Sequence, residues 1–542
     1  MARQKKISAL TPLLLAAGML LAAAGCGPRP DTQMAPMRDG VRLATDCFIP
    51  RATPAPVILV RTVYGRSDKS YRTTARGLKA SGIGLVVQDT RGRFGSEGAD
   101  RVFLDDAWGD LQDGADTVAW LRSQPWCNGT VVTMGGSALG ITQILMAPAT
   151  QDIAGQSISV ACSSLYDVAY IGGVWNKALV EDWTTGQGND YMLQTWRDHP
   201  RQDAFWDQLD AEARAGRVTA PAIHFGGWWD IFQQGTINNF TSRQYGGGAG
   251  ARGNQFLVMG PWAHGRQQDL GDLALPDNYD FPQSDLEWAL MQYWLTGAGP
   301  EVMESPRVYY YVLGDVDNAA APGNVWRTAD DWPPLETQPL EFHLGPSHAL
   351  STIPPAQAES YAFTFDPAHP CPTHGGANLS LPAGPFDQRQ VSGRSDVVSF
   401  ATKKLTEPVE ATGRISVRLF VQTTAPDTDF TAKLVDIYPD DREILLTDSI
   451  QRLKYRSGGA AAEPVAPGET TELTIDLWSF SIIFNAGHRI GVQISSSNYP
   501  RFEVNPNTGA DFPDNASGVT ATNTILTGPD HPSALILPVP QG

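Results

Sequence analysis

Residues 131–140 read VVTMGGSALG and lead into an apolar, helix-like run that ends at residue 147. This pattern predicts a strand, a tight turn with Ser137 at its tip, and a helix. Such a turn exposes the serine hydroxyl at the carboxyl edge of a sheet, while the helix offers unpaired N–H groups. A Gly/Ser motif can arise by chance in a chain with 53 glycines, but the flanking strand and helix favour a nucleophilic serine.

A nucleophilic serine needs a histidine base from later in the chain. Three histidines lie between this serine and a change in sequence pattern near residue 335: His199, His224 and His264. His264 follows the apolar run at residues 255–259, so it is expected in a loop at the carboxyl end of a strand, where catalytic groups collect. His224 lies within a predicted strand and His199 precedes a proline, so we predict His264 as the base.

The acid that orients the base is expected at another strand end. Asp230 follows the segment AIHFGGWW at residues 222–229. We predict that its carboxylate accepts the Nδ1–H of His264, so that the other ring nitrogen can take the proton of Ser137. Asp is also a favoured helix N-cap, and Asp230 is placed to cap a helix that starts at Ile231. The two roles are compatible.

Further short motifs accompany these residues in a fixed order. They read VRTVYGRSD at residues 60–68, VQDTRG at 87–92, WCNG at 126–129, GGSALG at 135–140, GWWD at 227–230 and GPWAH at 260–264. Three more read GPFDQR at 384–389, APDTDFTAK at 425–433 and FNAGHRI at 484–490. With these motifs the chain resembles the cocaine esterase / X-Pro dipeptidyl-peptidase family of α/β-hydrolases over nearly its whole mature length.

The resemblance implies an esterase, acylase or peptidase with Ser137, Asp230 and His264 as its catalytic triad. In that family the oxyanion hole combines the backbone N–H after the nucleophile with a tyrosine hydroxyl from an Arg-x-x-Tyr-Gly motif. These donors correspond here to Ala138 and Tyr64. The family usually has tyrosine directly after the nucleophile, and Ala138 keeps the backbone donor but removes one wall of the acyl pocket.

The substrate pocket is less well marked in the sequence. Four tryptophans are candidates for its walls: Trp175, Trp228, Trp229 and Trp262. A buried tryptophan is more often a core residue. The alternative activities, X-Pro dipeptidyl-peptidase and α-amino-acid ester hydrolase or acylase, need carboxylates that bind a substrate ammonium. Glu181 and Asp182 are candidates for these carboxylates, or form a solvated surface pair.

Composition narrows the partners. The chain has 542 residues, of which 42% are hydrophobic and 18% charged, enough for two or three globular cores. Its net charge of −18 argues against nucleic acid and anionic membrane surfaces as partners. A small ester, amide or short peptide is the expected substrate, and the predicted chemistry needs no cofactor and no metal.

The amino terminus has the layout of a bacterial export signal. Basic residues come first, an apolar run follows at residues 10–24, and Gly25 precedes Cys26. This predicts a lipoprotein signal at residues 1–26, with Cys26 lipidated and residues 27–36 as a tether. An ordinary secretory peptide is the alternative. We expect an exported protein that is anchored at the periplasmic or cell-surface side of a membrane.

Export also bears on the remaining cysteines, because an exported protein meets an oxidising compartment. Cys47, Cys127, Cys162 and Cys371 are far apart in the sequence. An even number is compatible with two disulfides, and buried free thiols are an equal alternative.

Organisation along the chain follows from the hydrophobic pattern. Near-continuous apolar strands are expected at residues 57–61, 84–88, 131–134, 157–161, 222–225 and 256–259. With helical spacing at residues 105–122, they predict a doubly wound α/β sheet. We expect the catalytic domain at residues 27–163 and 221–335, with a helical cap inserted at 164–220.

The last part of the chain, residues 336–542, has many short strands separated by turn residues. Strands are expected at residues 415–423, 432–437, 472–477 and 489–495. They predict an antiparallel sandwich, and the resemblance makes it a jelly roll. Since such a domain can bind carbohydrate, the non-enzyme alternative is a surface lipoprotein that binds polysaccharide and has a vestigial triad.

Overall fold

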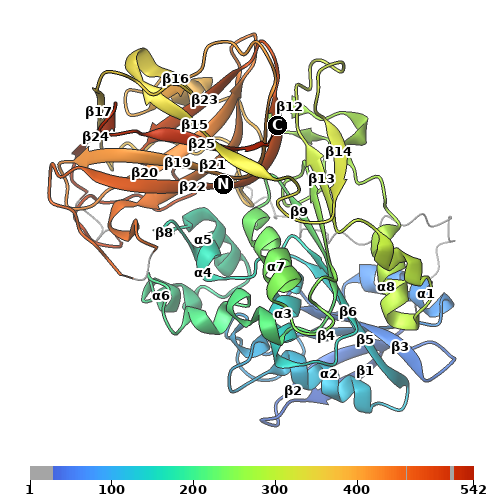
Figure 1. The fold of residues 1–542 in the computed structure, drawn as a ribbon. Coiled ribbons are helices and arrows are strands. Elements are labelled where there is room, and N and C mark those ends of the chain that lie inside the picture. Colours follow the sequence, from blue (N-terminus) through green and yellow to red (C-terminus); the bar gives the residue numbers. More distant parts are fainter. Residues whose placement is uncertain (1–27, 459–460, 513–517, 542) are drawn as a thin grey trace, which may run out of the picture. The chain divides into compact units, whose positions relative to one another are not determined.

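The computed structural model describes residues 28–458, 461–512 and 518–541, and its chain path is shown in Figure 1. These residues form two compact units. Unit 1 contains residues 28–161, 217–222 and 283–304, and unit 2 contains residues 162–216, 223–282 and 305–541. Cys26, the predicted lipidation site, lies outside the described residues. Within those residues, no helix combines the length and apolar character that a bilayer crossing needs.

Unit 1 is built on a sheet of mainly parallel strands. Its strand order is β1-β2-β4-β3-β5-β6, and β3, β4, β5 and β6 run parallel. The strands are β1 (Asp31–Pro36), β2 (Arg42–Phe48), β3 (Ala55–Thr62), β4 (Gly84–Asp89), β5 (Cys127–Gly136) and β6 (Gly155–Ser159). The predicted strands at residues 57–61, 84–88 and 131–134 lie within β3, β4 and β5. They are buried, as expected for strands covered on both faces.

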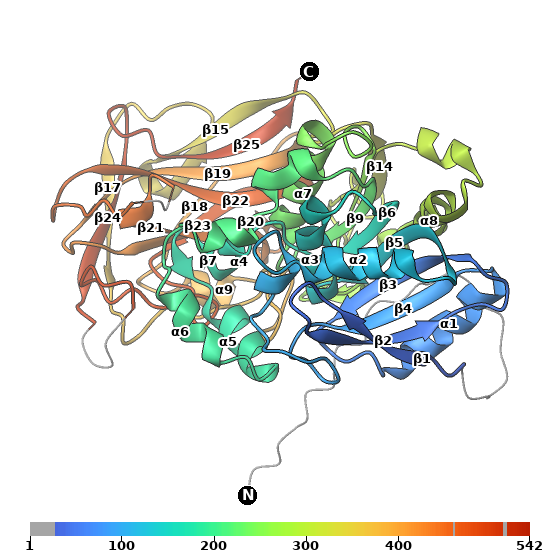
Figure 2. The same ribbon diagram turned by 90° about the horizontal axis from the view of Figure 1, so that it is seen from below.

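Four α-helices of the described residues accompany this sheet. They are α1 (Lys69–Ala80), α2 (Asp113–Ser123), α3 (Ala138–Met146) and α8 (Leu286–Thr296). Figure 2 shows α2 and α8 alongside β5. The helix predicted from residue 105 begins later, at Asp113. The reason is the buried guanidinium of Arg91, which pairs with Asp113 at 2.7 Å and lies 3.8 Å from Asp105. The chain between these two acids therefore forms a loop around the cation.

Unit 2 begins with the segment predicted as a cap. It forms the helices α4 (Tyr166–Ala169), α5 (Lys177–Gly186) and α6 (Tyr191–Arg197) and the short strands β7 (Tyr170–Ile171) and β8 (Val174–Trp175). Gly172 joins these two strands with a φ of +56°, and a Cβ there would lie 2.0 Å from the carbonyl oxygen of Ile450. Only glycine allows this close approach to β21 (Glu443–Arg452).

A smaller set of strands in unit 2 carries two of the predicted site residues. β9 (Ala222–Gly227), β10 (Gln255–Gly260), β13 (Val308–Val312) and β14 (Val325–Ala329) are adjacent in that order. β10 and β13 run parallel, and β13 and β14 antiparallel. Helix α7 (Gln233–Gly246) follows β9, and the short strands β11 (Asp269–Leu270) and β12 (Leu273–Ala274) follow β10.

The carboxyl-terminal half of unit 2 is the predicted sandwich. Its main strands pair as β17-β24-β19-β25-β15-β16-β18-β23-β20-β21, and β22 pairs with β19. Those not yet bounded are β15 (Thr337–Gly345), β16 (Ala349–Ser351), β17 (Glu359–Phe365), β18 (Val398–Ala401), β19 (Val409–Thr423), β20 (Asp429–Ile437), β22 (Thr471–Phe484), β23 (Arg489–Ser495), β24 (Ala521–Thr527) and β25 (Ala534–Pro540). A short α-helix, α9 (Arg389–Ser392), interrupts this series of strands. All four predicted strands lie within β19, β20, β22 and β23.

Buried and half-buried side chains alternate along β19, and this alternation shows which face of the strand packs into the sandwich core. Val417, Leu419 and Val421 on β19 are fully buried, while the residues between them are half-buried. This two-residue period turns one face of the strand to the core. The four cysteines of the described chain are buried free thiols, so the structure has no disulfide in this part of the chain.

Candidate active site

Ser137 occupies the sharp turn between β5 and α3 in unit 1. Its φ is 56° and its ψ −129°, a strained conformation for a residue with a side chain. Gly135 and Gly140 make the turn possible, since a Cβ on either would lie 2.6 Å from the Cβ of Leu139 or Ala161. The backbone N–H of Ser137 donates to the carbonyl oxygen of Ser159 at 2.9 Å. A rigid turn of this kind presents the serine hydroxyl at the strand end.

The two predicted oxyanion donors belong to the same unit. Ala138 is the first residue of α3, where a helix leaves its N–H groups without intrahelical partners. Tyr64 lies two residues beyond β3, which pairs in parallel with β5. The carboxyl ends of parallel neighbours meet at one edge of the sheet, so Tyr64 and Ser137 leave the same edge. Tyr64 is 42% exposed.

The structure brings Asp230 and His264 together in unit 2. Asp230 follows β9, His264 follows β10, and Oδ1 of Asp230 accepts from Nδ1 of His264 at 2.6 Å. Asp230 is fully buried. Its second oxygen accepts the N–H of Phe232 at 3.2 Å, just before α7 begins at Gln233. One carboxylate therefore orients the histidine and holds the turn that precedes the helix. The helix begins two residues later than predicted and its N-cap is Phe232, so the predicted N-cap role of Asp230 was wrong.

The other two histidines are engaged elsewhere. His224 is fully buried between Gln255, 3.1 Å from its Nε2, and Asn239, 3.2 Å from its Nδ1. Burial lowers the pKa of His224 to about 3, which keeps it neutral. His199 bonds Asp203 at 2.7 Å. The environment of His224 does not suit a catalytic base, which must titrate near the working pH. His199 follows helix α6 and does not lie at the end of a strand.

The four tryptophans predicted as pocket walls are all buried in unit 2. Their exposed fractions are 1% for Trp175 and Trp229, 3% for Trp228 and 2% for Trp262. Trp228 donates its indole N–H to the Tyr311 carbonyl at 2.8 Å. The hydrophobic core includes Trp228 and Trp229.

The two candidate carboxylates of the cap already have partners. Glu181 pairs with Lys177 at 3.0 Å and with Arg197, and it accepts the indole N–H of Trp175 at 3.1 Å. Asp182 accepts the hydroxyl of Ser380 at 2.5 Å. The charge of Glu181 is thus compensated within the protein, which makes it a poor site for a substrate cation.

A pocket of about 150 Å³ in unit 2 was not foreseen from the sequence. Asp167 of α4, Glu212 of the cap and Phe232 line it together with Arg414 of β19. Phe232 also meets the His264 ring edge-on, with ring centroids 5.6 Å apart. The pocket therefore lies one side chain away from the predicted base. Asp167 and Glu212 are 45 positions apart, and no motif in the sequence connects them.

The acids of this pocket are poorly hydrated. Loss of hydration, followed by the nearby charge of Glu212, raises the pKa of Asp167 to about 6. Loss of hydration also raises the pKa of Glu212. The hydroxyl of Ser163, which donates to this carboxylate at 2.5 Å, lowers the pKa by a smaller amount. The guanidinium of Arg414 is paired with Asp476 at 2.5 Å. Perturbed carboxylates in a concave site are typical of ligand binding.

Comparison with known proteins places these features in a family. The model of the X-Pro dipeptidyl-peptidase (S15 family) matches residues 39–191 and 181–266. The model of the X-Pro dipeptidyl-peptidase C-terminal non-catalytic domain matches residues 300–536. The cocaine esterase of Rhodococcus sp. (strain MB1 Bresler) is 34% identical over 580 residues, which cover 93% of this chain and 97% of that protein. The chain belongs to the cocaine esterase / X-Pro dipeptidyl-peptidase family.

Membership in the family makes the protein a serine hydrolase of the esterase and peptidase type. A solved α-amino acid ester hydrolase is similar with a TM-score of 0.81 and 25% identity over 98% of this chain and 100% of that chain. An aminopeptidase from the marine sediment archaeon Thaumarchaeota archaeon has the same fold, with a TM-score of 0.81 and 24% identity over 98% and 99% of the two chains. The predicted α/β-hydrolase fold with a following β-sandwich is confirmed.

Proposed function

We propose that the protein is an exported serine hydrolase that cleaves carboxylic esters or amides through an acyl-enzyme formed on Ser137. The observation that carries the proposal is the bond between Asp230 and His264, because a buried carboxylate on Nδ1 fixes the tautomer of a general base. The strained turn at Ser137 supports its role as nucleophile. The family resemblance supplies the pairing of Ser137 with His264.

The reaction would run in two acyl transfers. The Oγ of Ser137 attacks the acyl carbon while Nε2 of His264 takes the hydroxyl proton. The tetrahedral intermediate then breaks its C–O or C–N bond, and His264 gives the proton to the leaving alcohol or amine. In the second transfer a water attacks the acyl-enzyme, His264 takes a proton from it, and the carboxylic acid leaves as Ser137 regains its hydrogen. No cofactor enters these steps.

We assign stabilisation of the oxyanion to the Ala138 N–H and the Tyr64 hydroxyl. Ala138 begins α3, so its N–H points out of the helix along the favourable end of the dipole. Tyr64 follows β3, the parallel neighbour of β5, and is 42% exposed in unit 1. Donors that are fixed before the charge develops stabilise the transition state more than the ground state.

A second candidate function is hydrolysis of α-amino-acid esters or of X-Pro peptides. It is favoured by the acidic pocket beside Phe232, where Asp167 and Glu212 face one compensated guanidinium, that of Arg414. A substrate ammonium would neutralise the poorly hydrated carboxylates. Glu181 is already paired with Lys177 and does not support this function.

A substrate panel separates these activities. We would compare p-nitrophenyl butyrate, phenylglycine methyl ester and Gly-Pro p-nitroanilide by kcat/KM at about pH 7, below the usual pKa of an α-amino group. Preference for the neutral ester supports a general esterase, and preference for either ammonium substrate supports the second function. If the protein turned over none of the three, the proposal that it hydrolyses small esters or amides would be wrong.

We further propose export with a lipid anchor at Cys26, on the basic residues, apolar run and Gly-Cys pair of the amino terminus. The four remaining cysteines are buried thiols. An exported protein keeps such thiols reduced only where burial hides them from oxidants, and that burial is compatible with the proposed compartment.

A further inference from the structure

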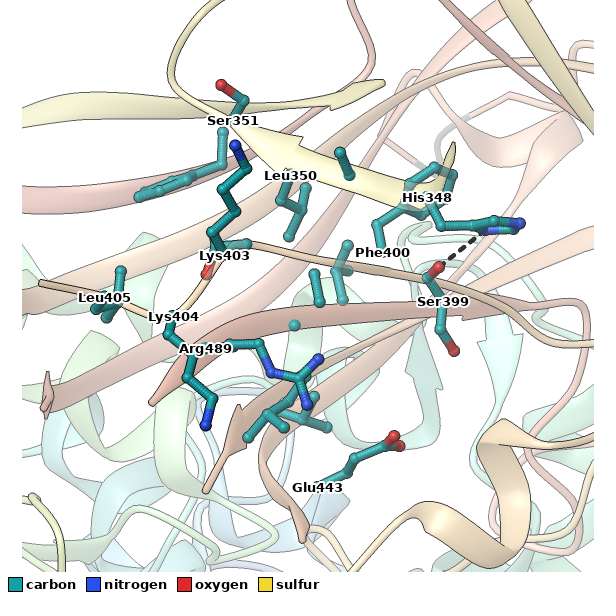
Figure 3. A pocket seen from close by; sticks show the side chains of 18 of the residues that line it. His348, Leu350, Ser351, Ser399, Phe400, Lys403, Lys404, Leu405, Glu443 and Arg489 are labelled. Atoms are coloured by element: carbon teal, nitrogen blue, oxygen red, sulfur yellow. Dashed lines mark hydrogen bonds between the residues drawn. The ribbon is translucent and has the colours of Figure 1, made fainter. Parts of the chain in front are cut away.

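One pocket in unit 2 lies on the sandwich, and none of the residues that line it has been assigned a role above. It has a volume of about 730 Å³ and is lined by residues of β16, β18, β20 and β23 (Figure 3). We call it the sandwich groove. Its size is that of a small-ligand site. We propose that the sandwich groove binds an acidic oligosaccharide, one whose sugar rings carry carboxylates.

The floor of the groove is a row of paired strands. Ala401 of β18 pairs with Gly491 of β23, which pairs with Val435 of β20. In the next row Arg489 pairs with Ile437, which pairs with Glu443. A Cβ on Gly491 would lie 2.7 Å from Val435 and 2.8 Å from Ile437, so glycine lets these apolar side chains lie across the floor. Such a surface suits the C–H face of a sugar ring.

Two residues that line the groove each have a buried polar atom without a hydrogen-bond partner among the described residues. Gln493 is 3% exposed, its Nε2 donates to Glu443 at 2.7 Å, and its Oε1 has no hydrogen-bond partner among the described residues. Ser399, paired with Gln493 across the strands, likewise has a buried Oγ with no partner in the described part of the chain. An unpaired buried polar atom is costly. Ligand hydroxyls, which both donate and accept, would satisfy both atoms.

The rim of the groove is cationic, although the protein carries a net charge of −18. Figure 3 shows Lys403 extended toward Leu350 and Ser351, with Lys404 and Arg489 on the side of Glu443. Arg489 is paired with Asp441. Lys403 and Lys404 are exposed, and neither has an ion-pair partner within the described residues. A local excess of positive charge on an acidic protein selects an anionic ligand.

Two other anionic ligands fit the groove less well. A fatty acid has no donor for Oε1 of Gln493. An extended acidic peptide is held mainly by backbone hydrogen bonds along a free strand edge. At the floor of the groove, β18, β23, β20 and β21 are already paired with one another, so a peptide laid across them would find no backbone ladder. Hydroxyls together with carboxylates match the groove best.

Calorimetric titration of the purified protein with trigalacturonate tests the proposal. We expect binding that weakens at least tenfold in Lys403→Gln/Lys404→Gln and weakens when NaCl rises from 50 to 500 mM. Ser399→Ala should weaken it as well, whereas Lys69→Gln, a change at an exposed lysine of α1, should not. Cellotriose, which is neutral, should bind at least tenfold more weakly. Hydrolysis of p-nitrophenyl butyrate should be the same in all these variants.

Three results would overturn the inference. One is the absence of trigalacturonate binding to the wild-type protein. Another is binding that the double lysine variant leaves unchanged, because the ligand would then sit elsewhere. The third is binding of hexaglutamate or laurate that is as tight as that of trigalacturonate and depends equally on Lys403 and Lys404, which would make the groove a general anion site.

Discussion

The Nδ1 of His264 lies 2.6 Å from the Oδ1 of Asp230, a carboxylate with no exposed surface. Each residue leaves the carboxyl end of its own strand, β9 or β10, and these strands are neighbours. A histidine held in this way presents Nε2 as an acceptor. In a serine hydrolase of this family, that atom is the natural acceptor for the nucleophile's proton.

Asp230→Asn should abolish most of the activity while leaving the fold intact. The amide can still accept the N–H of Phe232, but it no longer stabilises the His264 imidazolium and allows the wrong tautomer. We expect kcat to fall on the order of a thousandfold or more. Stopped-flow or plate kinetics with p-nitrophenyl butyrate measure the loss. Asp182→Asn, which changes an acid bonded to Ser380, is the matched control. Retention of a tenth of wild-type kcat by Asp230→Asn would contradict this role.

Tyr64→Phe should lower kcat by about a hundredfold with little change in KM. The ring stays and only the hydroxyl is lost, and because Tyr64 is 42% exposed, the melting temperature should hardly move. The control is Tyr245→Phe, which removes the hydroxyl of a tyrosine that is 50% exposed and lies in the other unit. A Tyr64→Phe enzyme with wild-type kcat would leave the oxyanion to backbone donors alone.

The pH dependence of substrate preference reports on the acidic pocket. Because the pKa of Asp167 is raised to about 6, its carboxyl is neutral below that pH and charged above it. An ammonium substrate needs the charged form. We therefore expect the ratio of kcat/KM for phenylglycine methyl ester to kcat/KM for p-nitrophenyl butyrate to rise as the pH increases from 5 to 7. Dividing by the neutral ester cancels titration of the base.

Asp167→Asn provides the control for that profile. It should lower the ratio at pH 7.5 and flatten its rise with pH, because the amide does not titrate. Asp530→Asn, a change at an exposed acid of the sandwich, should leave the profile unchanged. A ratio that is independent of pH in the wild-type protein would remove Asp167 from substrate recognition.

Cys26→Ser tests the proposed anchor. The change should move the protein from the membrane fraction to the soluble fraction, or leave its signal uncleaved, because lipidation requires the thiol. Cell fractionation with immunoblotting measures both outcomes. Cys47→Ser, at a buried thiol, is the control and should leave the distribution unchanged. Normal processing and unchanged membrane association in Cys26→Ser would contradict the lipid anchor.

The hydrophobic pattern of the sequence was sufficient to predict most of the sheets. The central segments of β3, β4 and β5 are apolar and buried, and β19 alternates between buried and half-buried residues from Ile415 onward, so each pattern matched its burial. The predicted start of α2 was wrong because a long-range contact determines where the helix begins. Arg91 pairs with both Asp105 and Asp113, and the chain between these two acids forms a loop instead of a helix. Local propensity contains no information about such a partner.

The predicted site depended on position along the chain more than on residue type. Asp230 and His264 could be paired because both follow apolar strands, and their bond was found where expected. Asp167, Glu212 and Arg414 could not be grouped, since they are polar residues in segments separated by 45 and about 200 positions, and only the folded unit brings them to one pocket. The sandwich groove likewise appears only when four strands pair.

Covalent labelling tests the central claim that Ser137 is the nucleophile activated by His264. The wild-type protein, incubated with a fluorophosphonate and digested, should give one modified peptide whose adduct tandem mass spectrometry assigns to Ser137. Ser137→Ala should remain unlabelled, His264→Ala should be labelled at least a thousandfold more slowly, and Ser399→Ala should behave as wild type. An adduct on another serine, or a His264→Ala protein labelled at the wild-type rate, would contradict the account.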